Sequence, residues 1–103
     1  MAGPAVWATM QARAGREDDA RAFLEEANRR ITESEPGTTS FHAMELGEGR
    51  FAIFNTFADD AAFLAHVQGP TAAWVQAQNP GLFTEPYAIT RARVFAAKPH
   101  AAG

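Results

Sequence analysis

Apolar and polar residues alternate along four stretches of the chain, which is the pattern of β-strands with two unlike faces. The predicted strands are residues 5–13, 38–46, 50–57 and 87–95. Gly47-Glu48-Gly49 separates the second from the third, and its glycines favour a hairpin because they adopt a positive φ without steric cost. In the third strand both alternating sets are largely apolar, so we expect both faces of the sheet to be covered.

A helical spacing of apolar residues begins after Gly15. Five of them recur at intervals of three and four and share one predicted helix face: Ala20, Phe23, Leu24, Ala27 and Ile31. The acidic triplet at residues 17–19 suits the positive N-terminal end of a helix, and Glu35-Pro36-Gly37 ends it.

Residues 57–74 predict a broken helix that covers the sheet. Asp59 is the expected N-cap of a short helix. That helix carries three apolar side chains and one imidazole: Phe63, Leu64, Val67 and His66. Gly69-Pro70 closes it and opens a second helix, which presents Trp74 and ends at Asn79-Pro80-Gly81. We interpret the two helices as a lid beneath which a small molecule binds, and residues 82–86 as an extended link to the last strand.

The order of these elements, β-α-β-β-α-β, predicts an α+β ferredoxin-like fold with a four-stranded antiparallel sheet and helices on one face. We expect a single domain over residues 1–103, with its core in residues 5–95 and a frayed tail from residue 96. The alternation points Trp7, Phe41 and Phe54 to the uncovered face. At ~25 cal/mol per Å², burial of these aromatic groups favours a homodimer that packs sheet against sheet.

Composition narrows the class of protein. Of the 103 residues, 47% are hydrophobic and 20% are charged, which is ordinary for a globular chain. A net charge of −3 without a basic patch argues against nucleic-acid binding. No apolar run approaches the ~20 residues of a membrane span, and no signal-peptide pattern opens the chain. Without cysteine there is no disulfide or thiolate ligand, and we expect a cytoplasmic protein.

Two histidines are the candidate bases, because an imidazole titrates near neutral pH. His66 lies beside Phe63 on the short helix and is able to point toward the sheet; alternatively it caps the helix end by donating to backbone carbonyls. His42 alternates with Phe41, and we expect it on the helix-covered face with Met44, either lining a pocket or hydrogen-bonded in the core. No carboxylate stands at ligand spacing from them, so no metal site is predicted.

The other candidate site residues suit a flat ligand. Asn55 shares its strand face with apolar residues, so its amide hydrogen-bonds either a substrate oxygen or neighbouring backbone. The aromatic residues able to form a slot are Phe57, Phe63, Trp74 and Phe83. Their alternative role is the ordinary core between helices and sheet. Arg91 and Arg93 are expected to reach solvent or to pair with acidic groups at a dimer edge.

Four short motifs occur in an ordered spacing along the chain: Arg13-Ala14-Gly15, Glu35-Pro36-Gly37, Phe57-Ala58-Asp59-Asp60, and Ala65-His66-Val67 followed by Gly69-Pro70. In this order they resemble the antibiotic biosynthesis monooxygenase family over residues 5–95. The resemblance implies a dimeric α/β barrel built from ferredoxin-like subunits. Members of this family include cofactor-free oxygenases of anthrones and quinols, haem-degrading enzymes and an isomerase-like branch.

The chain departs from the better-defined branches at several positions. The polar side chains of anthrone-oxidising members align with Met44, Ile53, Phe57, Phe63 and Gln76. Haem-degrading members carry an Asn and a His ligand where this chain has Ala8 and Gln76, so haem degradation is not expected. By position, Met44 and Gln76 join the candidate substrate-binding residues.

The resemblance implies a monooxygenase that oxidises a small planar aromatic substrate, anthrone- or quinol-like, with O₂ and no cofactor. His66 or His42 would remove a proton, and the resulting anion would transfer an electron to O₂ before the peroxide collapses to a quinone and water. Two alternatives stay open: a non-catalytic small-molecule-binding or stress-response protein of the same fold, and an isomerase or cyclase of a related small molecule.

Overall fold

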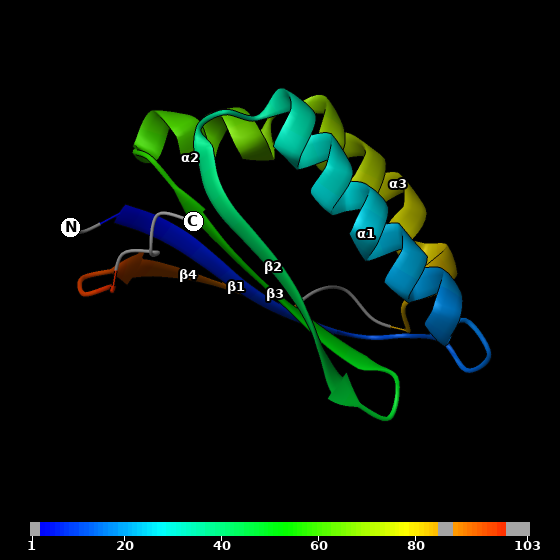
Figure 1. Ribbon diagram of the computed structural model, residues 1–103. Helices are drawn as coiled ribbons and strands as arrows, with labels where there is room; N and C mark the ends of the chain where they lie inside the picture. The colour runs from blue at the N-terminus through cyan, green and yellow to red at the C-terminus, as the bar shows by residue number, and fades with distance from the viewer. Residues whose placement is uncertain (1–2, 85–87, 99–103) are drawn as a thin grey trace.

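A computed structural model describes residues 3–84 and 88–98 (Figure 1). Its elements follow the predicted order, with the second helical segment divided in two. They are β1 (Gly3–Gln11), α1 (Glu17–Ser34), β2 (Thr38–Gly47), β3 (Arg50–Phe57), α2 (Asp60–Val67), α3 (Pro70–Leu82) and β4 (Ala88–Val94). Tyr87, the expected start of the last strand, and the tail beyond residue 98 lie outside the described residues.

The four strands form one antiparallel sheet in the order β2-β3-β1-β4. All three helices cover the same face of this sheet, and α1 and α3 run side by side (Figure 1). This is the α+β ferredoxin-like arrangement that the sequence predicts. No helix in the described parts of the chain is long and apolar enough to cross a membrane.

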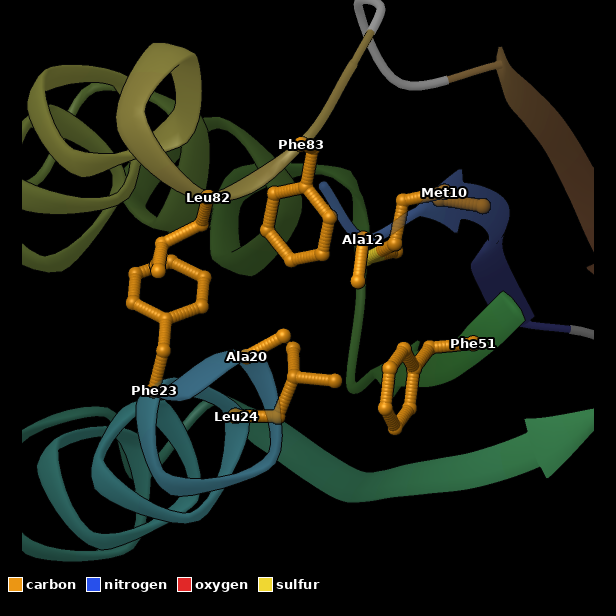
Figure 2. Packing of buried hydrophobic residues seen from close by; sticks show 9 residues of the cluster. Met10, Ala12, Ala20, Phe23, Leu24, Phe51, Leu82 and Phe83 are labelled. Atoms are coloured by element: carbon orange, nitrogen blue, oxygen red, sulfur yellow. The ribbon is translucent and has the colours of Figure 1, made fainter. Parts of the chain in front are cut away.

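The core lies between α1, the end of α3 and the middle of the sheet, and Figure 2 shows its side chains gathered from these elements. The predicted apolar stripe of α1 is buried along its whole length: Ala20, Phe23, Leu24, Ala27 and Ile31. Phe23 meets Phe83 edge-to-face, with ring centroids 5.9 Å apart, and Phe51 of β3 belongs to the same cluster. One continuous apolar cluster therefore fastens the helical layer to the strands.

The joint between α2 and α3 forms as the sequence predicts. Asp59 caps α2, its carboxylate accepting a hydrogen bond from the backbone N–H of Ala62 at 2.8 Å. Pro70 opens α3 at the position where its missing N–H costs nothing. A Cβ on Gly69 would lie only 2.8 Å from the carbonyl oxygen of Ala65, so the chain turns here only with glycine.

The predicted end of α3 is wrong, because the helix continues through Pro80 to Leu82. A proline this close to a helix end removes one N–H but leaves the following carbonyls available. Those carbonyls are taken up by the loop after β1: Arg13 Nε donates to Pro80 at 2.9 Å, and Arg16 donates to Gly81 at 3.2 Å. The loop thus stabilises a last turn that proline alone would disfavour.

The strand register corrects one prediction about the two faces of the sheet. Trp7 and His42 both pair with Phe54, so these three side chains share the face that no helix covers. Phe41 instead pairs with the buried Asn55 and lies on the helix-covered face. The expectation that Phe41 points away from the helices is therefore wrong, whereas that for Trp7 and Phe54 is confirmed.

Candidate functional site

A cavity of about 300 Å³ lies between the sheet and the helical layer. Its walls are mainly apolar and come from α1, α2, α3 and the inner face of the sheet. Five lining side chains are polar: Asn55, His66, Thr71, Gln76 and Arg91. A mostly apolar hollow with a few converging polar groups is the usual form of a small-molecule site.

Two rows of residues that cross the sheet supply the floor of this cavity, and all of them except Ala43 line it. Strand pairing aligns the first, here called the Asn55 row, as Phe41, Asn55, Val6 and Arg91. It aligns the second, the Ile53 row, as Ala43, Ile53, Ala8 and Ile89. The floor therefore combines an apolar strip with a neighbouring strip that presents one amide and one guanidinium group.

His66 forms part of the wall above this floor, and a carboxylate holds it from behind. Its Nδ1 lies 2.6 Å from Oε1 of Glu35, and both side chains are largely buried, with 16% and 14% of their surface exposed. An ionised carboxylate only accepts hydrogen bonds, so a hydrogen bond of His66 to an ionised Glu35 requires the hydrogen on Nδ1. The pair is therefore arranged as a base with an orienting partner.

Glu35 is itself held in place. Thr38 Oγ1 donates to the same Oε1 at 2.8 Å, whereas Oε2 is buried without a partner among the described residues. The close approach of α2 to this turn depends on Gly37, since a Cβ there would lie 2.6 Å from that of Ala62. The turn that ends α1 therefore also holds the carboxylate that contacts His66.

Asn55 and Arg91 supply the polar groups of the floor. Asn55 is 2% exposed, and its Oδ1 has no hydrogen-bond partner among the described residues. Arg91 places its guanidinium carbon 4.3 Å from the ring centroid of Phe63, another lining residue. Next along β4 on the same face, Arg93 pairs with Asp60 at 3.6 Å.

The predicted aromatic slot does not assemble as one surface. Phe63 lines the cavity, and Phe57 packs behind it, with ring centroids 5.4 Å from Phe63 and 5.2 Å from His66. Trp74 stacks on Phe23 at 4.9 Å under the guanidinium of Arg30, and Phe83 is buried in the core cluster. Trp74, Phe57 and Phe83 are not among the lining residues, whereas Gln76 is.

The structure separates the two candidate bases. His42 lies on the uncovered face, its ring centroid 6.4 Å from that of Phe54, and Met44 pairs with Ala52 on that same face. The expectation that His42 and Met44 share the helix-covered face is wrong. The side chains of β2 alternate between the two faces of the sheet, and both sets are moderately apolar. The alternation alone therefore does not tell which set faces the helices.

Sequence reasoning missed three polar residues of the site: Glu35, Thr71 and Arg91. Glu35 stands out in the sequence only as part of a helix stop, since its partner His66 is 31 positions away. Arg91 gives a weak signal, because pairing of β4 with β1 is needed to place it beside Val6. Among the residues that the structure describes, no cluster of three or more His, Cys, Asp or Glu side chains is suited to a metal ion.

The comparisons with known proteins agree with this architecture. NE2512 from Nitrosomonas europaea, a protein of unknown function, is 32% identical, with a TM-score of 0.88 over 99% of this chain and 98% of its own. Rv0793 from Mycobacterium tuberculosis is 25% identical, with a TM-score of 0.76 over all of both chains. A candidate antibiotic biosynthesis monooxygenase from Bacteroides thetaiotaomicron shares the fold at 17% identity, with a TM-score of 0.80 over 96% and 95% of the two chains.

Curated proteins give no significant match. The family model described as antibiotic biosynthesis monooxygenase matches residues 5–78, which include Glu35, Asn55 and His66. That match spans well over half of the 103 residues. The chain therefore belongs to the antibiotic biosynthesis monooxygenase family.

Proposed function

We propose that the protein is a cofactor-independent monooxygenase that oxidises a small planar aromatic compound in the cavity, with His66 as the base and Glu35 as its positioning residue. The observation that carries the proposal is the 2.6 Å contact between Nδ1 of His66 and Glu35, made at the wall of a mainly apolar cavity. Glu35 stabilises the imidazolium that forms when Nε2 accepts a proton, and it holds the ring in one orientation.

The reaction starts from a phenol, or the enol of an anthrone, that carries a C–H at the position to be oxidised. Nε2 of His66 takes the O–H proton, and the anion transfers one electron to O₂. The superoxide and the substrate radical combine at that carbon to form a peroxide. As the C–H proton leaves, the O–O bond breaks: one oxygen becomes the new carbonyl and the other leaves as water with both protons. The substrate supplies all four electrons.

The cavity contributes in two ways. Its apolar walls, including Phe23, Ile31 and Val75, withhold water from the anion and so favour its oxidation over reprotonation. The apolar floor residues Val6, Ala8 and Ile53 would support the face of an aromatic ring, so that the substrate binds in a fixed orientation.

The test is oxygen uptake with a panel of anthrones and hydroquinones, together with quinone formation, for the wild type and His66→Ala. We expect uptake by the wild type without added cofactor and a fall of about ten-fold or more in the variant. His42→Ala is the matched control, because His42 lies on the opposite face of the sheet.

Equal activities of the wild type and His66→Ala would remove the histidine from the reaction. No uptake with any member of the panel would refute the oxygenase proposal for these substrates. Tight binding without turnover would then favour the non-catalytic binding protein, and a changed carbon skeleton without oxygen uptake would favour the isomerase or cyclase.

A further inference from the structure

Arg91 is a cation on the cavity floor with no carboxylate partner among the described residues, whereas Arg93 on the same face of β4 is paired. Arg93 contacts Asp60 at 3.6 Å, whereas the guanidinium of Arg91 has no ion-pair partner within the described chain and lies 4.3 Å from the ring centroid of Phe63. Stacking on an aromatic ring uses the flat face of a guanidinium group. The N–H donors on its edge then remain available for an anion, which they bind in a bidentate way.

Asn55 presents an unpaired group in the same row. Its side chain is 2% exposed and lines the cavity, yet its Oδ1 accepts no hydrogen bond from the described residues. A buried amide oxygen without a donor is costly, and a bound ligand with an O–H or N–H group removes that cost. The pairing register places Val6, a small apolar residue, between Asn55 and Arg91.

Neighbouring strands are about 4.8 Å apart, so the backbones of Asn55 and Arg91, two strands apart, are separated by roughly 10 Å. The two side chains therefore address opposite ends of one ligand that lies across Val6 and Ala8. We propose that the cavity selects a planar hydroxylated aromatic acid, with the carboxylate at Arg91 and the hydroxyl donating to Asn55. This inference rests on the proposed function for the location of the site, but it concerns binding and not turnover.

The test uses redox-inert two-ring ligands, so that binding is measured without any reaction. Equilibrium dialysis compares 6-hydroxy-2-naphthoate with its neutral methyl ester, which isolates the carboxylate, and with 2-naphthoate, which isolates the hydroxyl group. We expect the wild type to bind the hydroxy acid about ten-fold more tightly than either analogue.

Variants assign each preference to a residue. In Arg91→Gln the preference for the acid over its ester falls to near unity, while Arg93→Gln on the same face of β4 retains it. In Asn55→Leu, which keeps a side chain of similar size, the preference for the hydroxyl group is lost and that for the carboxylate stays. Each comparison is made within one variant, so a uniform loss of affinity through altered folding does not imitate the result.

Equal affinity of the wild type for acid and ester, no binding of any of the three ligands, or the same loss in Arg93→Gln as in Arg91→Gln would overturn the proposal. The oxygenase proposal fails separately. Acid-selective binding without oxygen uptake from any hydroxylated acid leaves the ligand class standing and refutes the chemistry. Oxygen uptake that is equally fast with neutral hydroquinones supports the chemistry and overturns the selection of an acid.

Discussion

His66 depends on a carboxylate from a distant part of the chain, so the roles of the two residues are tested separately. Glu35 forms the turn that ends α1, and His66 lies on α2. The ring of Phe57 packs beside the imidazole at a centroid distance of 5.2 Å. Packing on one side and a hydrogen bond on the other leave the imidazole little freedom to rotate, which is the requirement for a base that acts in one direction.

Replacing Glu35 by Gln keeps the size of the side chain and removes its charge. The amide no longer stabilises the protonated imidazole and permits either ring tautomer, so we expect kcat to fall by about ten-fold or more with little change in ligand affinity. Glu33→Gln, two residues earlier at an exposed position of α1 that pairs with Arg29, is the control and should turn over substrate as the wild type does. A fall in affinity at unchanged kcat would show that Glu35 serves binding instead.

The glycine beside this glutamate carries a second prediction. Gly37→Ala would bring two Cβ atoms to 2.6 Å and push α2 away from the turn. We expect a loss of about 1–3 kcal/mol in the free energy of unfolding, measured with urea, because overpacked sites relax only in part. Ala62→Gly removes the opposing methyl group and should restore much of that loss in the double variant. Additive effects of the two changes would rule out the contact as the cause.

At the scale of elements, α1 is held at its surface by a cluster of charges. Glu26 accepts hydrogen bonds from Arg29, at 2.6 and 2.8 Å, and from Arg30 at 2.9 Å. These bonds, that from Arg29 above all, lower the pKa of Glu26 from 4.5 to about 2. On the sheet side, Arg21 pairs with Glu45 of β2 and likewise lowers the pKa of that carboxyl. The first cluster supports the helix and the second fastens it to an edge strand.

The Glu26 cluster gives a pH dependence with a defined sign. Because the native state lowers the pKa of Glu26, its contribution to stability is complete above about pH 4.5 and is lost as the pH falls toward 2. In urea unfolding, the difference in the free energy of unfolding between the wild type and Glu26→Gln should shrink as the pH falls across this window. Arg29→Gln removes the main cause of the shift and should flatten the same acid-side slope. A constant difference between wild type and Glu26→Gln from pH 6 to pH 2.5 would contradict this expectation.

The elements themselves were largely predictable because each has local signals. The stripe of α1, the Asp59 cap and the Gly69-Pro70 joint all act within a few residues, and the structure confirms them. The faces of β2 were not predictable, because this edge strand carries similar side chains on both sides and its pairing is irregular near each end. The Glu35–His66 contact was equally hidden, because only the packing of α2 on the turn brings the two together.

At the scale of the whole molecule, no described helix covers one face of the sheet. Trp7 is 37% exposed there, and it lies with His42, Met44 and Phe54 around a shallow apolar hollow. The helices occupy only the other face (Figure 1). A second copy of the chain, packed sheet against sheet, is the occupant that the sequence predicts, and it would remove this apolar surface from water.

We therefore expect the wild type to sediment as a dimer and Phe54→Lys to sediment as a monomer at the same concentration. Burial of an unpaired ammonium group in the centre of an apolar interface costs more free energy than the apolar contacts supply. Leu64→Lys places the same charge on an exposed apolar position of α2 and should leave the mass unchanged. A wild type that is monomeric at micromolar concentration would contradict the sheet-to-sheet dimer.

Arg91 differs from the other polar residues of the cavity in its place along the chain. It ends the Asn55 row on the edge strand β4 and lies beyond residues 5–78, the segment shared with the family model. Its side chain is exposed, whereas that of Asn55 is buried at the cavity floor. In the proposed site, the residue that binds the ligand's charge therefore lies outside the matched segment, whereas the base lies within it. Substitution of Arg91 on β4 would then change which ligands the scaffold accepts, while the proposed base His66 is kept.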